Sequence, residues 1–220
     1  MNQKIKNIIT SIIESFIRNI SGRIGIIIRR KYYSNKFAKC GKNLRIDEGV
    51  IIQGLKDIYI GDNVWIDKYC ILMAGKVNIP LEQTVIKENK DFKYKQGELY
   101  IGSNTHIGCQ SILQAHGGIS IGDYFTSSSG CKIYSLSNDV QRCQYGTHSE
   151  KEINYVLSTI VIENNVWLGL NTIALSGTIE KNSFIAPNSV VITTIKENSF
   201  ASGNPAKKIK NRFENYDSKF

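Results

Sequence analysis

The chain has 220 residues, of which 41% are hydrophobic and 21% are charged. This composition is that of a globular protein and excludes a disordered chain or a collagen-like fibre. The length predicts one domain with an appendage. The net charge of +9 is concentrated at the two ends of the chain, in residues 1–31 and 206–220. A nucleic-acid-binding protein usually carries its charge along a folded face, so we expect two local anionic contacts and no nucleic-acid partner.

The cysteines indicate a reducing compartment. Their number is odd and no two form a C-x-x-C pair, so neither a zinc site nor a disulfide framework is predicted. We therefore expect a cytoplasmic protein. Glu14 interrupts the apolar stretch near the N-terminus, which argues against a signal peptide. The five cysteines are Cys40, Cys70, Cys109, Cys131 and Cys143.

The N-terminal segment, residues 1–35, is predicted to be an amphipathic helical segment. Its apolar residues recur at steps of three and four and form one stripe. The stripe either caps the end of the folded body or lies in an anionic membrane interface, at the inner face of the membrane. The stripe contains Ile5, Ile8, Ile9, Ile12, Ile13, Phe16, Ile17 and Ile20.

From residue 58 the period becomes six. An aliphatic residue recurs at every sixth position and a small residue follows four positions later, which is the hexapeptide repeat. Three such hexads form one triangular coil with short parallel strands on three faces, and the coils stack about 4.8 Å apart. The inward aliphatic positions are Ile60, Ile66 and Leu72; Ile101, Ile107 and Leu113; Ile121, Ser127 and Ile133; Ile162, Leu168 and Ala174; and Ile179, Ile185 and Val191.

The repeat is interrupted at several places. A β-helix domain is expected over 36–205, with charged excursions at 76–98 and 139–157 and one irregular coil within 41–57. Ala174 and Ile179 are one residue closer than the period requires, which predicts a tightened corner. The basic C-terminal tail, 206–220, is expected to be helical.

Two motifs, N-V-W-L-G at 165–169 and G-N-P-A-K at 203–207, resemble the hexapeptide-repeat acyltransferases, and most of all the maltose, galactoside and polysaccharide O-acetyltransferases. The resemblance covers 58–212. It implies a left-handed parallel β-helix, a homotrimer, acetyl-CoA as acyl donor and no metal. The implied reaction is O-acetylation of a sugar hydroxyl in a surface polysaccharide or its small-molecule or lipid-linked precursor.

The resemblance also assigns the cofactor residues. The tryptophan that matches Trp167 borders the acetyl site and is expected to touch both acceptor and cofactor. Trp167 belongs to a column of outward side chains at equivalent positions of successive coils. The column also contains Trp65, His106, Thr126 and Phe184. The pantetheine arm is expected along Gly169, Leu170, Ala186 and Pro187, and the CoA phosphates beside Lys207 and Lys210.

The catalytic histidine of the galactoside enzymes aligns with Asn138, whose amide cannot serve as a general base. Acetyl transfer to a hydroxyl needs an imidazole that removes the proton, so His116, one coil earlier, is the favoured candidate. Gly117 and Gly118 follow it and are expected to leave that corner open to a ligand. His106 and His148 are the other candidate bases. Asn138 and Asp139 are predicted to bind substrate, and Asp139 to orient a base.

Three alternatives remain open at this stage. An amino-sugar N-acetyltransferase would use the same fold and donor. A non-catalytic trimeric scaffold would explain Asn138. The γ-type carbonic anhydrases share the prism but need three converging histidines, two of them closely spaced. Here His106, His116 and His148 are 10 and 32 residues apart, which disfavours that metal site.

Overall fold

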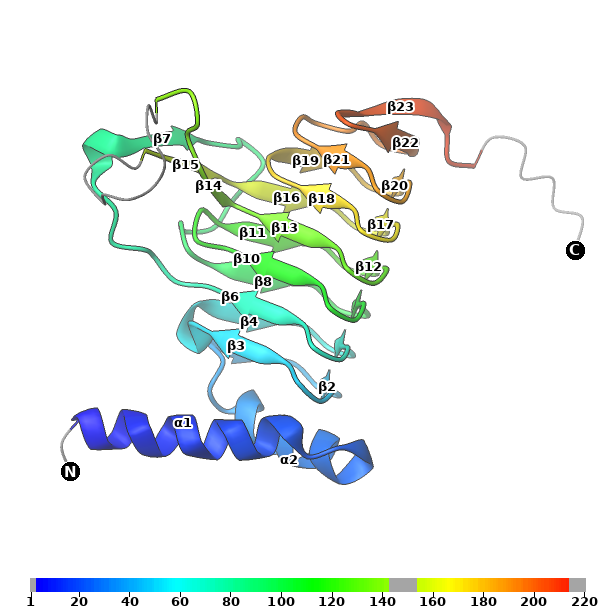
Figure 1. Cartoon of the computed structure of the whole chain (residues 1–220). Coiled ribbons are helices and arrows are strands. Elements are labelled where there is room, and N and C mark those ends of the chain that lie inside the picture. Colours follow the sequence, from blue (N-terminus) through cyan, green and yellow to red (C-terminus); the bar gives the residue numbers. More distant parts are fainter. Residues whose placement is uncertain (1–2, 143–153, 214–220) are drawn as a thin grey trace, which may run out of the picture.

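The computed structural model describes residues 3–142 and 154–213 of the chain. Two helices, α1 (Gln3–Asn19) and α2 (Gly22–Ser34), lie across one end of a prism built from short parallel strands (Figure 1). The predicted fold, a left-handed parallel β-helix with an N-terminal helix, is confirmed. Strands β22 and β23 close the opposite end of the prism.

The strands of the prism form three sheets, which we call faces 1, 2 and 3 in the order in which the chain visits them. Face 1 contains β1 (Lys39–Cys40), β4 (Ile58–Ile60), β8 (Leu99–Ile101), β11 (Ile119–Ile121), β16 (Ile160–Ile162) and β19 (Gly177–Ile179). Face 2 contains β2 (Arg45–Ile46), β5 (Trp65–Ile66), β9 (His106–Ile107), β12 (Thr126–Ser127), β17 (Trp167–Leu168), β20 (Phe184–Ile185), β22 (Ser199–Gly203) and β23 (Ala206–Asn211). Face 3 contains β3 (Ile51–Gln53), β6 (Ile71–Met73), β10 (Ile112–Gln114), β13 (Lys132–Tyr134), β18 (Ile173–Ala174) and β21 (Val190–Val191).

The hexapeptide positions form the core. All fifteen predicted inward residues are at most 3% exposed, and their small partners are buried as well. Successive coils pair in register, so that Ile66 lies beside Ile107 and Ile107 beside Ser127. Each inward side chain therefore packs on its equivalent in the coils above and below.

Asparagines make the corner between faces 1 and 2 in every described coil except one, where Tyr124 takes the same position with φ of 58°. At this corner the backbone takes the left-handed conformation, which asparagine tolerates better than other residues with a side chain. The side chains also bond from coil to coil, for example from Asn63 Nδ2 to Asn104 Oδ1 over 2.9 Å. These asparagines have φ between 55° and 59° and are Asn43, Asn63, Asn104, Asn165, Asn182 and Asn198.

The corner between face 3 and the next strand of face 1, which we call the return corner, is the one whose length varies. At the other two corners the inward residues are always six apart. At the return corner Ile60 follows Ile52 by eight positions and Ile121 follows Leu113 by eight, whereas Ile179 follows Ala174 by only five. The short step is the tightened corner, and Gly177 makes it with φ of 88°.

The first coil is more regular than expected. Cys40, Ile46 and Ile52 are six apart and pair in register with the next coil, so residues 41–57 do not form an irregular coil. The irregularity is confined to a single 3-10 turn, Leu55–Asp57, at the return corner. That turn adds two residues and shifts the phase of the repeat.

Both excursions leave the prism at the return corner, between β6 and β8 and between β13 and β16. They meet in a small separate sheet made of β7 (Thr84–Lys87), β14 (Leu136–Asn138) and β15 (Tyr155–Ser158). The parallel pairing of β7 with β15 joins the two excursions to each other. A 3-10 turn, Leu81–Gln83, precedes β7.

The C-terminal segment is not helical where the structure describes it, which corrects the expectation for the tail. After the turn at Gly203 the chain reverses, and β23 pairs antiparallel with β22. Gly203 has φ of 110°, a conformation that a residue with a side chain rarely adopts. Lys207 and Lys210 therefore extend from a strand at the edge of face 2.

A buried arginine fastens the helices to the prism. Arg29 of α2 is 1% exposed and donates hydrogen bonds to the carbonyl oxygens of Ile46 (2.9 Å), Ile17 (2.9 Å) and Ile20 (2.7 Å). Ile17 and Ile20 lie at the C-terminal end of α1, where backbone carbonyls lack partners within the helix. Burial lowers the pKa of Arg29 from its ordinary value. One side chain thus connects α1, α2 and the first coil.

We predict that Arg29→Ala lowers the free energy of unfolding by about 3 kcal/mol, because three buried carbonyls lose their donor and a cavity is left. Urea denaturation followed by circular dichroism measures this change. Arg23→Ala, at an exposed position of the same helix, should change the stability by less than about 0.5 kcal/mol. Equal effects of the two substitutions would contradict the role of Arg29.

Candidate active site

His116 lies at the return corner, in the coil where that corner is two residues longer than the period. Its Nδ1 is 2.9 Å from the carbonyl oxygen of Gly75 in the coil below. A carbonyl oxygen can only accept, so Nδ1 carries the hydrogen. In the neutral ring, Nε2 is then the basic nitrogen. The corner holds the imidazole in the tautomer that a general base needs.

The two glycines after His116 do not open the corner, contrary to expectation. A Cβ at Gly117 would lie 2.4 Å from the carbonyl oxygens of Ser135 and Ser158, and one at Gly118 would lie 2.5 Å from the Phe92 ring. Both glycines are buried and allow the excursions to pack closely. Their amides are also used, since Gly117 donates to Ser135 Oγ (2.8 Å) and Gly118 to the Ala115 carbonyl (2.9 Å).

Two hollows adjoin this corner. A cavity of about 300 Å³ lies under the first excursion and reaches Gly117. Its walls are Ile86, Glu88, Asn89, Phe92, Tyr94, Gln96, Gly117, Leu157 and Thr159. A second hollow of about 490 Å³ lies between the small sheet and face 3 and contains Asn138 and Asp139. Each hollow combines apolar walls with a few polar groups, as ligand sites do.

Asn138 and Asp139 thus lie beside each other in the second hollow, at the end of β14. Asp139 does not touch a histidine within the described residues. Its Oδ2 accepts a hydrogen bond from Arg142 Nε over 2.7 Å, and this bond lowers the pKa of the carboxyl. The expectation that Asp139 orients a base finds no support in this geometry. His148 lies outside the described residues.

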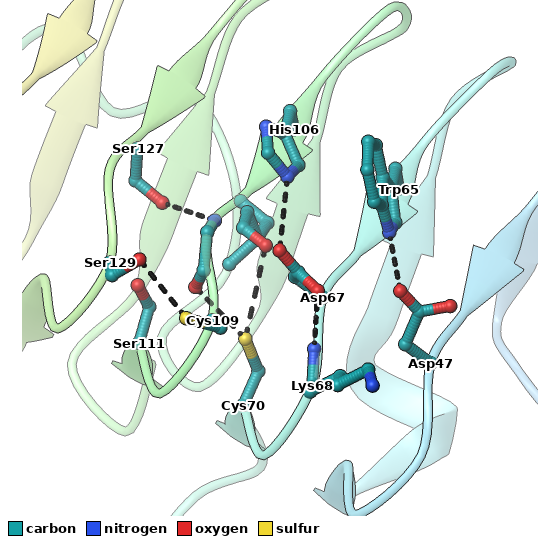
Figure 2. A network of polar contacts seen from close by, with 12 residues as sticks. Asp47, Trp65, Asp67, Lys68, Cys70, His106, Cys109, Ser111, Ser127 and Ser129 are labelled. Atoms are coloured by element: carbon teal, nitrogen blue, oxygen red, sulfur yellow. Dashed lines mark hydrogen bonds and ion pairs between the residues drawn. The ribbon is translucent and has the colours of Figure 1, made fainter. Parts of the chain in front are cut away.

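His106 lies elsewhere, on face 2, within a polar network (Figure 2). Its ring stacks on Trp65 at 4.3 Å between centroids, and Nε2 is 3.6 Å from Asp67 Oδ2. Trp65 Nε1 in turn donates to Asp47 Oδ2 over 2.9 Å. The stacking and the network fix the ring of His106 against the surface of face 2. Within one chain, the structure does not bring His106 near the corner that carries His116.

The predicted column of outward side chains is present on face 2, because the strands pair in register. Trp167 is 44% exposed, and its Nε1 donates to Ser128 Oγ over 3.2 Å. Lys210 continues the column beyond Trp167, with Nζ 5.5 Å from the centroid of the Phe200 ring. In spatial order the column is Arg45, Trp65, His106, Thr126, Trp167, Phe184, Phe200 and Lys210.

The residues predicted to bind pantetheine gather at the corner between faces 2 and 3. Gly169 and Leu170 follow β17, and Ala186 and Pro187 follow β20 one coil above. The amide of Gly169 donates to Ile185 O over 2.7 Å, and a Cβ there would lie 2.7 Å from the nitrogen of Pro187. Glycine therefore lets the two coils pack closely, and Leu170 stays 51% exposed.

A cluster of aromatic residues on face 1 escaped the sequence analysis. Tyr100 stacks between Tyr59 (4.2 Å) and Tyr94 (3.5 Å), and both Tyr59 and Tyr100 donate to the buried carboxylate of Glu98. Burial raises the pKa of Tyr100. The repeat gave one indication of this cluster, because Tyr59 and Tyr100 occupy equivalent positions of successive coils. Tyr94 comes from the excursion, where no periodicity applies.

The candidate base and the predicted cofactor residues lie on different sides of one prism. His116 is at the return corner, between faces 3 and 1, which is opposite face 2. Trp167 and Lys210 are on face 2, and the pantetheine residues are at its edge. A single chain therefore does not bring His116 and Trp167 together. A second copy with its face 2 against this corner would complete the site.

No protein-family model matches the chain. It is 27% identical over 180 residues to a dTDP-4-amino-4,6-dideoxy-D-glucose acyltransferase of Escherichia coli, covering 80% of this chain and 83% of the relative. AntD, an N-acyltransferase from Bacillus cereus solved with dTDP and 3-hydroxybutyryl-CoA, has a TM-score of 0.67 at 22% identity, over 83% of this chain and 87% of its own.

A hexapeptide-repeat acetyltransferase from Vibrio cholerae, solved with acetyl-CoA, has a TM-score of 0.53 at 18% identity. That match covers 91% of this chain and 84% of the other. The two structures share the fold, and the E. coli relative aligns in sequence over 83% of its length at 27% identity. With the motifs at 165–169 and 203–207, these findings show that the chain is similar to hexapeptide-repeat acyltransferases in fold and, over most of its length, in sequence.

Proposed function

We propose that the chain transfers an acyl group from a CoA thioester to the amino group of a nucleotide-linked amino sugar. The amine acceptor, named above as the alternative to a sugar hydroxyl, is preferred because the E. coli relative acts on such a sugar and matches 80% of this chain. The neighbouring structures that hold CoA or its thioesters support the choice of donor. A surface polysaccharide or its precursor would be the destination of the acylated sugar.

The observation that carries the mechanism is the fixed tautomer of His116. The acceptor nitrogen attacks the thioester carbonyl carbon, the new C–N bond forms, and the C–S bond breaks. Nε2 of His116 takes the proton that the nitrogen loses and returns it to the departing thiolate. In the neutral ring, the bond from Nδ1 to Gly75 O leaves Nε2 as the nitrogen that can accept this proton. The amides of Gly117 and Gly118 already donate within the corner, so neither is free to donate to the oxyanion.

The cavity of about 300 Å³ beside Gly117 is proposed as part of the acceptor site, with Asn138 and Asp139 in the adjacent hollow. The donor is proposed to lie along Trp167, Gly169, Leu170, Ala186 and Pro187 of a neighbouring copy. A homotrimer satisfies this arrangement, because each of three copies then offers face 2 to one neighbour and its return corner to the other.

The acceptor class can be tested directly. We expect acetyl-CoA with dTDP-4-amino-4,6-dideoxyglucose to release thiol and to give an N-acetylated product by mass spectrometry. The matched sugar nucleotide with a hydroxyl at the same carbon should react at least about 100-fold more slowly, because a hydroxyl is the weaker nucleophile. Faster acylation of the hydroxyl sugar would favour O-acetylation, and no transfer to either would favour the scaffold.

His116→Asn should lower kcat at least about 100-fold, because an amide keeps the hydrogen bond to Gly75 O but cannot accept the proton. His106→Asn is the matched control and should change kcat by less than about fivefold. Steady-state kinetics with both variants separate the two candidates. Full activity of His116→Asn would remove His116 from the mechanism.

Lys207→Glu should weaken CoA binding about tenfold in Kd, because a charge reversal opposes the CoA phosphates. Lys208→Glu is the control, since adjacent residues of a strand point to opposite sides. Calorimetric titration with CoA measures both variants. Equal affinities of Lys207→Glu and the unmodified chain would show that the phosphates bind elsewhere.

A further inference from the structure

Helix α1 presents its apolar stripe to solvent and not to the protein. Ile8, Ile12 and Phe16 are 60%, 53% and 73% exposed. With 3.6 residues per turn, Glu14 lies about 200° from both Ile12 and Phe16. Glu14 faces the protein, where it accepts a hydrogen bond from the Tyr32 hydroxyl over 3.1 Å. An ordinary surface helix turns its apolar face the other way.

Helix α2 extends the same surface. Ile24 and Ile27 are 69% and 56% exposed, whereas Arg29 on the opposite side is buried. Both helices lie across the end of the prism that is farthest from β22 and β23 (Figure 1). We call the exposed apolar residues of the two helices the basal stripe; it contains Ile5, Ile8, Ile9, Ile12, Ile13, Phe16, Ile24 and Ile27.

Positive charge accompanies the basal stripe. Arg23 and Lys31 are exposed and lie within two turns of Ile24 and Ile27, on the same side of α2. Arg30 instead reaches the prism, where its Nε donates to the Leu44 carbonyl. The single acidic residue of 1–31 is Glu14, which is turned inward and is 3.6 Å from Lys36 Nζ. The surface therefore offers apolar and cationic groups together, with its one carboxylate withdrawn.

We propose that α1 and α2 form a docking surface for an anionic lipid bilayer. The isoleucines and Phe16 would enter the boundary between headgroups and acyl chains, and the cations would contact anionic headgroups. Within the described residues neither helix is long and apolar enough to cross the bilayer, so the contact is peripheral. Arg29 fixes both helices to the first coil, so the bilayer would contact the prism at the end covered by α1 and α2.

The test uses the full chain and sedimentation with vesicles of phosphatidylcholine, with or without phosphatidylglycerol. We expect binding to the anionic vesicles and at least tenfold less to the neutral ones. The variant Ile8→Ser, Ile12→Ser, Phe16→Ser should bind anionic vesicles at least about tenfold more weakly, because three apolar side chains are lost from the contact. Arg23→Glu with Lys31→Glu should have a similar effect.

The control variants carry equivalent substitutions far from α1 and α2. Ile209→Ser with Phe213→Ser replaces two other exposed apolar residues, and Lys90→Glu with Lys208→Glu reverses two other charges. Both should bind like the unmodified chain.

Equal losses in the controls, or no sedimentation of the unmodified chain, would overturn the proposal. A lower molar mass of the serine variant by light scattering would also overturn it, because the stripe would then be a contact between copies. Acyl transfer to a soluble acceptor should persist in every variant, so this test is independent of the proposed reaction.

Discussion

In-register stacking of successive coils determines where the side chains of the prism lie. An inward residue must fill the space between its equivalents one strand spacing away on either side, because a parallel β-helix has no other core. Ile46 and Ile52 are buried against the second coil, as Ile179, Ile185 and Val191 are buried in the last complete one, and Cys40 is partly buried beside Ile60. The same register stacks the outward residues, so chemistry on the surface is arranged in columns.

Two of the three corners leave the chain no freedom of length, and this is why both excursions and the loop that carries His116 lie at the third. A change in the step between faces 1 and 2 would break the asparagine ladder and move every later inward residue out of phase. The return corner accepts an added turn at Leu55–Asp57, two extra residues around His116 and two long excursions, while the strands that follow keep their register. The length of the loop around His116 can therefore change without disturbing the packing of the core.

Stacking also explains which parts of the molecule were predictable. The periodicity predicted the inward residues and the column through Trp167, because both follow from phase alone. Phase carries no information about the excursions, so the packing of Phe92 on Gly118 and the pairing of Asp139 with Arg142 were missed. The strand at Ala206–Asn211 was mistaken for a helix because it reverses and pairs antiparallel with β22, a pairing that the hexapeptide period does not predict. The apolar stripe of α1 was predicted, but its direction depends on Arg29 and Glu14, whose contacts come from distant segments.

The pairing of β7 with β15 makes the two excursions a single piece of structure, although they are some seventy positions apart in the chain. Thr84 to Lys87 share backbone hydrogen bonds with Tyr155 to Ser158, and Asn89 bonds through its amide nitrogen to Thr159 Oγ1 over 2.7 Å. An exchange of one excursion between homologous proteins would leave a sheet edge without its partner. Evolution of a new ligand preference in this scaffold thus requires matched changes in both excursions. Grafting experiments would have to transfer the two excursions as a pair.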